Sequence, residues 1–172
     1  HGRAPCGHAP CWCSRPNPNI PRMLSYRHGF HAGNHADVLK HVALVALLRI
    51  LTRKDKPLVV LDTHAGAGMY SLEQGFAVRN AEFCEGIARL WERSDLPAPV
   101  ADYLDQVRAV NADGVLRQYP GSPRIALGVL RPQDRLRLFE LHSTEGQVLA
   151  QEFAKDSRRV TVTAGDGFAG LK

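Results

Sequence analysis

The sequence predicts an α/β fold, namely the N-terminal part of a doubly wound parallel sheet. A strand, a loop and a helix follow one another three times along the chain, and each predicted strand ends near an acid, at Asp62, Glu140 and Asp166. The first strand is wholly apolar, and a glycine-rich turn follows it directly. Since parallel strands present their carboxyl ends at one edge of a sheet, we expect the three acids to lie close together there.

The first predicted strand, Leu58–Leu61, follows a helix that begins after Asn34 and ends at about Arg53. The side chain of Asn34 suits the cap position of this helix, and Lys54–Pro57 ends it. All four residues of the strand are apolar. An uninterrupted apolar run is typical of a strand that is buried on both faces.

A long segment separates the first strand from the second. Residues 80–111 carry apolar side chains at helical spacing in two pieces, and the second piece opens near Pro97. Tyr119–Pro123 predicts a turn, and Arg124–Leu130 a short helix. We interpret residues 80–130 as a helical insert, which is unusual because connections between strands are generally short.

The second strand is predicted over Arg135–Leu141, ending at Glu140, and the third over Val160–Thr163, with a helix over Thr144–Lys155 between them. Three strands alone would leave the apolar first strand at an open edge, which invites aggregation. We therefore interpret residues 23–172 as an incomplete domain. The alternative is a complete, small three-stranded domain.

Residues 1–22 differ in composition from the rest of the chain. They contain five prolines, three of the four cysteines and almost nothing to bury, and patterned sequence starts only after Met23. We interpret residues 1–22 as a disordered or non-native N-terminal extension that lies outside the domain.

Length and charge limit the classes of protein that the chain can belong to. The 172 residues are 44% hydrophobic, which is enough for one domain with a core. No apolar run approaches the roughly 20 residues that span a bilayer, so we expect no membrane partner. The cysteines do not demand an oxidising compartment, so the expected location is the cytoplasm. The net charge is +5, and Leu24–Lys56 holds six bases against two acids. This stretch is either a docking surface for a polyanion or a solvated helix face.

The loop after the first strand is the main candidate for ligand binding. Gly66 and Gly68 let the backbone approach a ligand closely. Only Gly-x-Gly of the dinucleotide-binding pattern is present. The missing third glycine favours a pocket for S-adenosylmethionine, which has no pyrophosphate to seat on a helix N-terminus, over a nicotinamide pocket.

Each strand-end acid suits one part of such a cofactor. The acceptor-only carboxylate of Glu140 is placed to bind both ribose hydroxyls. Asp166 suits the adenine amino group, and Asp62 the amino-acid end, directly or through water. Strand-end acids also cap helices, but three of them beside a Gly-x-Gly turn favour ligand binding.

The histidines and aromatic residues near the start of the domain allow two further interpretations. No His-Glu-x-x-His arrangement occurs among the histidines, and we expect no metal. Tyr26, Arg27 and Phe30 can stack on an RNA base and hold a phosphate, or they can belong to a loop packed onto the domain.

Four segments together carry a specific resemblance. The segments MLSYRHGFHAGNHADVLKH (23–41) and LDTHAGAG (61–68), with YPGSP (119–123) and ELH (140–142), closely resemble the ribosomal RNA large subunit methyltransferase J family. Members of this family are bacterial enzymes that methylate N6 of one adenine in 23S rRNA. The resemblance covers Met23–Lys172.

The resemblance implies a Rossmann-like, S-adenosylmethionine-dependent methyltransferase fold. Matched motif by motif, the S-adenosylmethionine pocket includes His41, His64, Ser122, Glu140, Asp166 and Gly167. Tyr26 matches a tyrosine that contacts the substrate RNA. The segment before Asp166 is one residue longer than the family pattern.

One motif expected from the resemblance is missing. Adenine-N6 methyltransferases of this type resemble one another in an Asp-Pro-Pro-Tyr motif after the fourth strand, which holds the exocyclic amine and stacks on the flipped base. The 172 residues contain no Asp-Pro-Pro, so the catalytic residue stays unknown. We expect the full-length protein to be a monomer that acts on 23S rRNA. We expect residues 1–172 alone to be inactive. A non-catalytic RNA- or nucleotide-binding module and a nicotinamide-dependent oxidoreductase are the alternatives.

Overall fold

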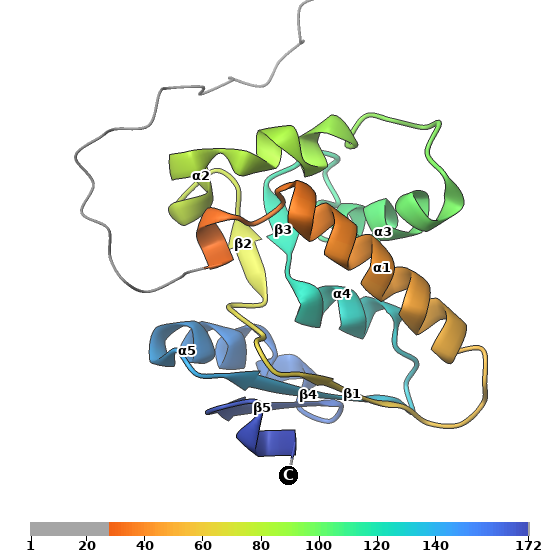
Figure 1. Cartoon of the computed structure of the whole chain (residues 1–172), viewed down its shortest axis with the longest axis vertical. Coiled ribbons are helices and arrows are strands. Elements are labelled where there is room, and N and C mark those ends of the chain that lie inside the picture. The colour runs from red at the N-terminus through yellow and green to blue at the C-terminus, as the bar shows by residue number, and fades with distance from the viewer. Residues whose placement is uncertain (1–27, 172) are drawn as a thin grey trace, which may run out of the picture.

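A parallel sheet forms one half of the molecule, as shown by a computed structural model that describes residues 28–171 (Figure 1). Its strands are β1 (Val59–Asp62), β4 (Arg135–Glu140) and β5 (Val160–Ala164), in the order β1-β4-β5. Both pairs are parallel. The predicted parallel α/β arrangement is therefore confirmed, and each strand begins and ends within one residue of its expected position.

Helices cover one face of this sheet. Helices α1 (His35–Leu51), α4 (Ser122–Val129) and α5 (Ser143–Glu152) lie on the same side of it (Figure 1). The side chains between sheet and helices form one buried cluster, namely Leu48, Ala65, Ala126, Leu130, Leu136, Leu138, Leu149, Phe153 and Val160. Their burial holds the strand ends and the helices in one rigid frame.

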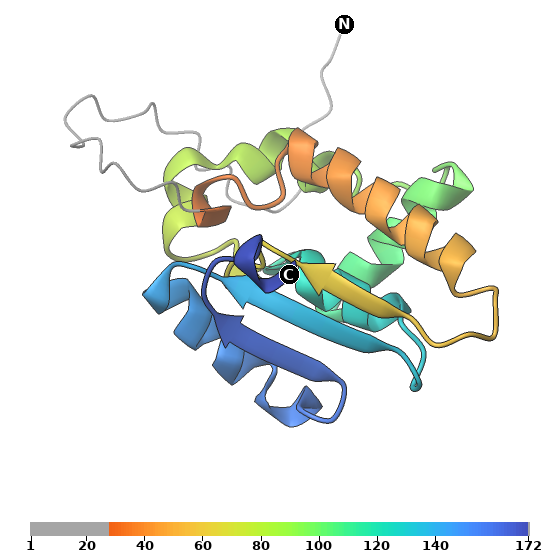
Figure 2. The ribbon, with the colours of Figure 1, turned by 60° about the horizontal axis from the view of Figure 1, so that its bottom comes forward.

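The other face of the sheet is open along β1, and the prediction that β1 is buried on both faces was wrong. Val59 and Leu61 are 53% and 38% exposed, whereas Val60 between them packs against the helices. Side chains alternate along a strand, and on the open face Val59 lies beside Arg135. In this sheet β1 is an edge strand, paired with β4 alone and covered on one face only (Figure 2).

The insert between β1 and β4 has more structure than its sequence indicates. It contains a two-stranded antiparallel sheet, β2 (Met69–Ser71) and β3 (Gln118–Pro120), that was not predicted. The second expected helix is confirmed as α3 (Ala98–Ala109). The first is instead α2 (Phe76–Asn80) followed by two 3-10 turns, η2 (Glu82–Glu85) and η3 (Ile87–Arg89). Ala81 adopts a left-handed conformation with φ of 50° and ends α2.

A second buried cluster joins the insert to α1. Its largest fully buried side chains are Tyr103, Tyr119 and Ile87. Asn34 caps α1 as expected, accepting a hydrogen bond from the backbone N–H of Asp37 at 2.9 Å. Helix α1 therefore packs on both cores and connects the insert to the sheet.

The structure does not describe residues 1–27 or residue 172. The proposed extension, residues 1–22, lies outside the described residues. Among residues 28–171, no helix has the length and apolarity needed to cross a membrane. The helical insert spans most of the expected range of residues 80–130, with α4 at its end.

Candidate functional site

At two positions of the loop after β1, the backbone has a conformation that only glycine adopts without strain. Gly66 and Gly68 have φ of +62° and +80°. A Cβ at position 66 would collide with the hydroxyl of Tyr70, and one at position 68 would lie 2.9 Å from the ring of Phe153. Both glycines are therefore required by conformation and by space.

Glu140 ties this loop to the end of β4. Its Oε2 accepts a hydrogen bond from the backbone N–H of Gly66 at 2.7 Å, and its Oε1 accepts one from the N–H of His142 at 2.8 Å. A carboxylate offers about four acceptor positions. Two positions therefore remain for hydroxyl groups of a ligand.

Asp62 connects the end of β1 to the N-terminus of α4. Its Oδ1 accepts from the backbone N–H of His64 at 3.1 Å, and its Oδ2 accepts from the hydroxyl of Ser122 at 2.5 Å. The structure therefore brings together Asp62, His64 and Ser122, which the sequence placed in one pocket.

The loop after β5 closes against the loop after β1. A Cβ at position 167 would collide with the backbone of Thr63, so Gly167 permits this close approach. Oδ1 of Asp166 accepts from the backbone N–H of Phe168 at 2.9 Å. Phe168 is 63% exposed, and its ring lies edge-on to His64 with 5.3 Å between centroids. His64 and Phe168 thus form an exposed aromatic pair beside the strand ends.

His41 lies deeper than the other predicted site residues. Its Nδ1 is 2.8 Å from the hydroxyl of Tyr119, which is 3.0 Å from the hydroxyl of Tyr103. Burial lowers the pKa of His41 to about 4, against the opposing charge of Asp37. Tyr119 lies in β3, three residues before Ser122, which contacts Asp62. His41 is therefore connected to the strand-end loops indirectly, through its contact with Tyr119.

Sequence reasoning missed Asp37, whose side chain is fully buried. Its carboxylate lies 2.9 Å from Nε2 of His28 and 2.8 Å from Nζ of Lys40, and it accepts from the backbone N–H of Gly33 at 3.1 Å. Burial favours the neutral acid, but the hydrogen bond and charge of His28, with Lys40, lower its pKa to about 2. Asp37 therefore holds the start of the described chain against α1. The signal was available, since Asn34 and Asp37 have capping-box spacing with Asp in place of Glu.

The site as a whole is an edge of three carboxylates beside glycine-rich loops. Tyr26, the predicted RNA contact, lies outside the described residues. Within residues 28–171, no group of three or more histidine, cysteine or acidic side chains is arranged to hold a metal ion. Parallel strands, carboxylates at their ends and a Gly-x-Gly turn are the features of a Rossmann-like, nucleotide-binding α/β fold.

Comparisons with known proteins identify the family. The family model described as "Ribosomal RNA large subunit methyltransferase D, RlmJ" matches residues 55–172. Ribosomal RNA large subunit methyltransferase J of Escherichia coli strain K12 is 54% identical over 150 residues, which are 87% of this chain and 53% of that protein. The protein of the same description from Haemophilus influenzae is 46% identical over 151 residues, again 87% and 53%.

A solved structure has the same fold. The crystal structure of protein LPL1258 from Legionella pneumophila superposes with a TM-score of 0.74 at 43% identity, covering 82% of this chain and 51% of that one. The chain belongs to the RlmJ family of ribosomal RNA large subunit methyltransferases, as its motifs indicated. It spans about half the length of the relatives it matches.

Proposed function

We propose that the whole protein methylates N6 of a specific adenine in 23S rRNA, with S-adenosylmethionine as the methyl donor. The observation that carries the proposal is the edge formed by Asp62, Glu140 and Asp166 beside two glycines with positive φ. Membership of the RlmJ family supports the substrate, because the matched relatives are named for ribosomal RNA of the large subunit.

The strand-end residues fit S-adenosylmethionine by their hydrogen-bonding capacity. Glu140 is proposed to accept from both ribose hydroxyls, since the amides of Gly66 and His142 occupy only part of its capacity. Asp166 would accept from the adenine amino group. Asp62 would bind the amino-acid end, while the hydroxyl of Ser122 holds its carboxylate in place.

The remaining pocket residues are proposed to shape and close the site. Gly66, Gly68 and Gly167 leave space where a Cβ would collide. His64 lies exposed at the edge of the pocket next to Phe168. His41 is proposed to stay neutral, because burial lowers its pKa to about 4, and to set the position of β3 before Ser122.

The chemistry requires the two reactants to be held in line. When bound, S-adenosylmethionine supplies a methyl group on a positively charged sulfur. The residues of this chain bind and orient its nucleoside and amino-acid parts, and such positioning is a large source of rate enhancement. Tyr26 is proposed to contact the RNA. The catalytic acid that would hydrogen-bond the exocyclic amine of the adenine is not assigned. The 172 residues contain no Asp-Pro-Pro motif that could supply it.

A methyl-transfer assay with the full-length protein tests this proposal. We expect a tritiated methyl group to pass from S-adenosylmethionine to 23S rRNA purified from cells that lack the gene, and mass spectrometry of the nucleosides to show N6-methyladenosine. Residues 1–172 alone are expected to bind the cofactor weakly and to transfer nothing. Tyr26→Ala should lower the activity on RNA while leaving cofactor affinity unchanged.

Three results would contradict the proposal. RNA binding without any methyl transfer would assign the protein to the non-catalytic binding modules. Binding of NADH in place of S-adenosylmethionine would favour an oxidoreductase. An equal loss of activity and cofactor affinity in Tyr26→Ala would give that residue a structural role. The proposal further places the protein in the cytoplasm as a monomer without a membrane partner.

A further inference from the structure

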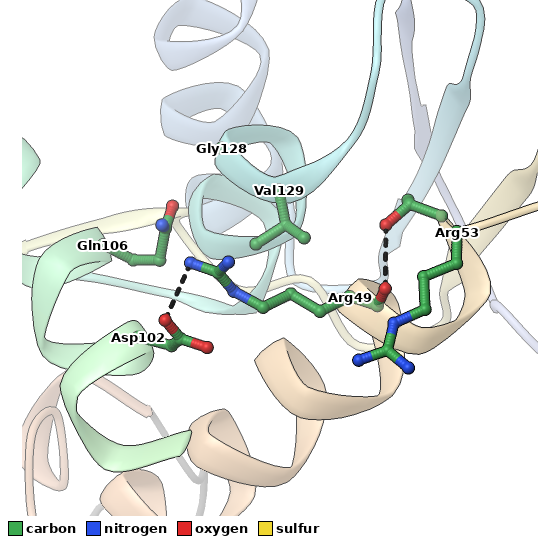
Figure 3. A pocket seen from close by; sticks show the side chains of 7 residues that line it. Arg49, Arg53, Asp102, Gln106, Gly128 and Val129 are labelled. Atoms are coloured by element: carbon green, nitrogen blue, oxygen red, sulfur yellow. Dashed lines mark hydrogen bonds and ion pairs between the residues drawn. The ribbon is translucent and has the colours of Figure 1, made fainter. Parts of the chain in front are cut away.

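A second pocket lies between helices α1, α3 and α4, away from the strand-end site (Figure 3). Its volume is about 400 Å³. The residues that line it are Arg49, Thr52, Arg53, Asp102, Gln106, Gly128 and Val129. Most of this lining is polar, and it includes two guanidinium groups. A charged ligand therefore suits the pocket better than an apolar one.

The charges of the pocket do not cancel. Nη2 of Arg49 lies 3.1 Å from Oδ1 of Asp102, and Arg53 follows four residues later, in the turn after α1 (Figure 3). A guanidinium has five N–H donors, so this ion pair leaves most of the donors of Arg49 available. Two cations against one carboxylate leave a single positive charge, which matches the single negative charge of a phosphodiester.

Gly128 leaves room for a side chain of α3 in the wall of the pocket. A Cβ at position 128 would collide with Oε1 of Gln106. Gly128 is not among the residues with positive φ, so its backbone does not need glycine. Glycine weakens a helix relative to alanine. Glycine at this position of α4 leaves space for the amide of Gln106, a neutral hydrogen-bonding group on the same side of the pocket as the guanidinium of Arg49 (Figure 3).

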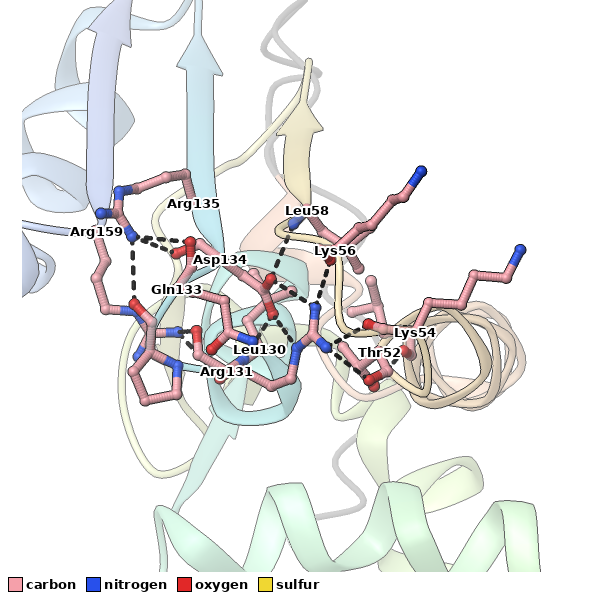
Figure 4. A network of polar contacts seen from close by, with 12 residues as sticks. Thr52, Lys54, Lys56, Leu58, Leu130, Arg131, Gln133, Asp134, Arg135 and Arg159 are labelled. Atoms are coloured by element: carbon pink, nitrogen blue, oxygen red, sulfur yellow. Dashed lines mark hydrogen bonds and ion pairs between the residues drawn. The ribbon is translucent and has the colours of Figure 1, made fainter.

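The surface around the pocket is basic. From Arg49 to Lys56 the chain carries four bases against Asp55 alone. The side chains of Lys54 and Lys56 extend away from the neighbouring polar network, in which only their carbonyl oxygens take part (Figure 4). Clustered lysines and arginines of this kind contact the phosphates of nucleic acids without reading their sequence.

We propose that this pocket binds a backbone phosphodiester of RNA through Arg49 and Arg53. The proposal rests on the proposed function, because it takes RNA as the substrate. Arg49 follows His41 by eight residues on α1, which is roughly 12 Å along the helix axis, and Arg53 lies in the turn that follows the end of α1. At about 3.4 Å per nucleotide of a strand, this separation corresponds to several nucleotides. The pocket thus holds a flanking part of the RNA while the target adenine lies at the strand ends.

RNA binding by the full-length protein tests the proposal. The probe is a fluorescently labelled hairpin from 23S rRNA that contains the methylated adenine, measured by anisotropy over a series of salt concentrations. In Arg53→Gln, Kd is expected to rise about four- to sixfold at 0.15 M salt, and the slope of log Kd against log salt to fall by about 1, because one phosphate contact is lost. Asp102→Asn should tighten binding, because it releases Arg49 from its ion pair.

The two variants have opposite expected effects, so a general loss of folding cannot imitate the result. Arg158→Gln, which removes an exposed arginine from the turn before β5, is the matched control and should leave the slope unchanged. An equal loss in Arg158→Gln and Arg53→Gln, or weaker binding in Asp102→Asn, would overturn the pocket as a phosphate site. Tight binding of inorganic phosphate that Arg53→Gln abolishes, with RNA binding unchanged, would assign the pocket to a free anion instead and overturn the RNA proposal.

The two proposals fail separately. If the wild-type protein binds the hairpin and neither pocket variant changes the affinity, this inference is wrong and the proposed methylation is unaffected. If the variants behave as expected but no methyl group is transferred, the proposed reaction is wrong and the RNA site stands. If the wild-type protein does not bind the hairpin, both fall.

Discussion

The two ends of the parallel sheet both contain acids, but they use them differently. At the amino end, the fully buried Asp134 accepts from the backbone N–H of Leu58 at 2.9 Å and from the guanidinium of Arg131 at 3.0 Å (Figure 4). The same guanidinium donates to carbonyl oxygens of the segment before β1, those of Thr52, Lys54 and Lys56. Charge and hydrogen bonds are satisfied within the protein.

At the carboxyl end, the acids bind only neutral donors. Glu140 accepts from two backbone amides, and Asp62 accepts from an amide and a hydroxyl. Among the ion pairs of residues 28–171, none includes Asp62, Glu140 or Asp166. These three carboxylates thus have no cationic partner among the described residues, and part of their acceptor capacity is unused. The paired acid at the amino end fixes the fold, whereas the acids without a cationic partner are the ones proposed to bind a ligand.

The largest effect is expected at the amino end. Asp134→Ala should lower the free energy of unfolding by about 3 to 5 kcal/mol, because it leaves the charge of Arg131 without its carboxylate partner and the N–H of Leu58 without an acceptor. Hydrogen bonds from Arg131, against the effect of burial, lower the pKa of Asp134 to about 2. Its contribution is therefore complete above the unfolded pKa of about 3.8 and is lost as the pH falls through about 2. Urea unfolding at neutral pH measures the change.

Asp105→Ala is the matched control for this measurement. Asp105 is exposed on α3 and lies 3.9 Å from Arg108, so its loss should cost less than about 1 kcal/mol. The folded Asp134→Ala protein should also bind S-adenosylmethionine with unchanged affinity. A cofactor affinity that falls with stability would show that the two ends of the sheet are not independent.

A somewhat smaller effect is expected from His41, which is buried on α1 against Tyr119 and Tyr103 of the insert. Its pKa is lowered by burial to about 4, whereas in the unfolded chain it is about 6.5. Between these values the unfolded state binds a proton that the folded state does not, so stability should fall as the pH decreases from 6.5 to 4, by about 3 kcal/mol in total. Urea unfolding at a series of pH values shows the slope.

A variant assigns this slope to one residue. His41→Gln removes the titrating group but keeps a side chain able to hydrogen-bond Tyr119, so the pH dependence between 4 and 6.5 should become shallower. His35→Gln, at an exposed position on the same helix, should leave it unchanged. An unaltered slope in His41→Gln would mean that another group carries the titration, and it would remove the argument that His41 stays neutral.

The sheet was predictable from the sequence because its signals are local. The apolar run before Asp62 and the alternation over β4 each fix a strand by residues next to one another. The open face of β1 was not predictable, since an apolar strand looks the same whether or not a second layer covers it. Whether Val59 is buried depends on segments that are distant in the sequence. The residues next to Val59 in the sequence do not indicate whether those segments cover it.

The candidate site was predictable in part for the same reason. Strand-end acids and the glycines of the loop can be read from spacing, and the structure brings Asp62 and Ser122 into contact across 60 residues. The small sheet of β2 and β3 was missed, because three-residue strands have too little periodicity to be recognised. The pocket at Arg49 and Arg53 also needed the structure, since α3 and α4 supply its other walls.

The smallest free-energy change, and the most specific one, is expected at Glu140. Glu140→Ala should weaken S-adenosylmethionine binding by more than tenfold, or about 1.4 kcal/mol, because it removes a charged acceptor proposed to hold the ribose. Loss of its bonds to Gly66 and His142 should lower stability by only about 1 to 2 kcal/mol. Isothermal titration calorimetry of the full-length protein measures the affinity.

Two further variants decide whether the lost affinity comes from the ligand contact or from the loop. Glu92→Ala removes an exposed acid of the insert and should leave the titration unchanged. Glu140→Gln keeps the shape of the side chain and one carbonyl acceptor for the N–H of Gly66, but it puts a donor where a ribose hydroxyl would donate. If Glu140→Gln binds the cofactor like the wild type, Glu140 only positions the glycine loop. If it loses affinity while its stability is kept, the carboxylate contacts the cofactor. The carboxyl end of the sheet then differs from the amino end in function, as the pairing of their acids predicts.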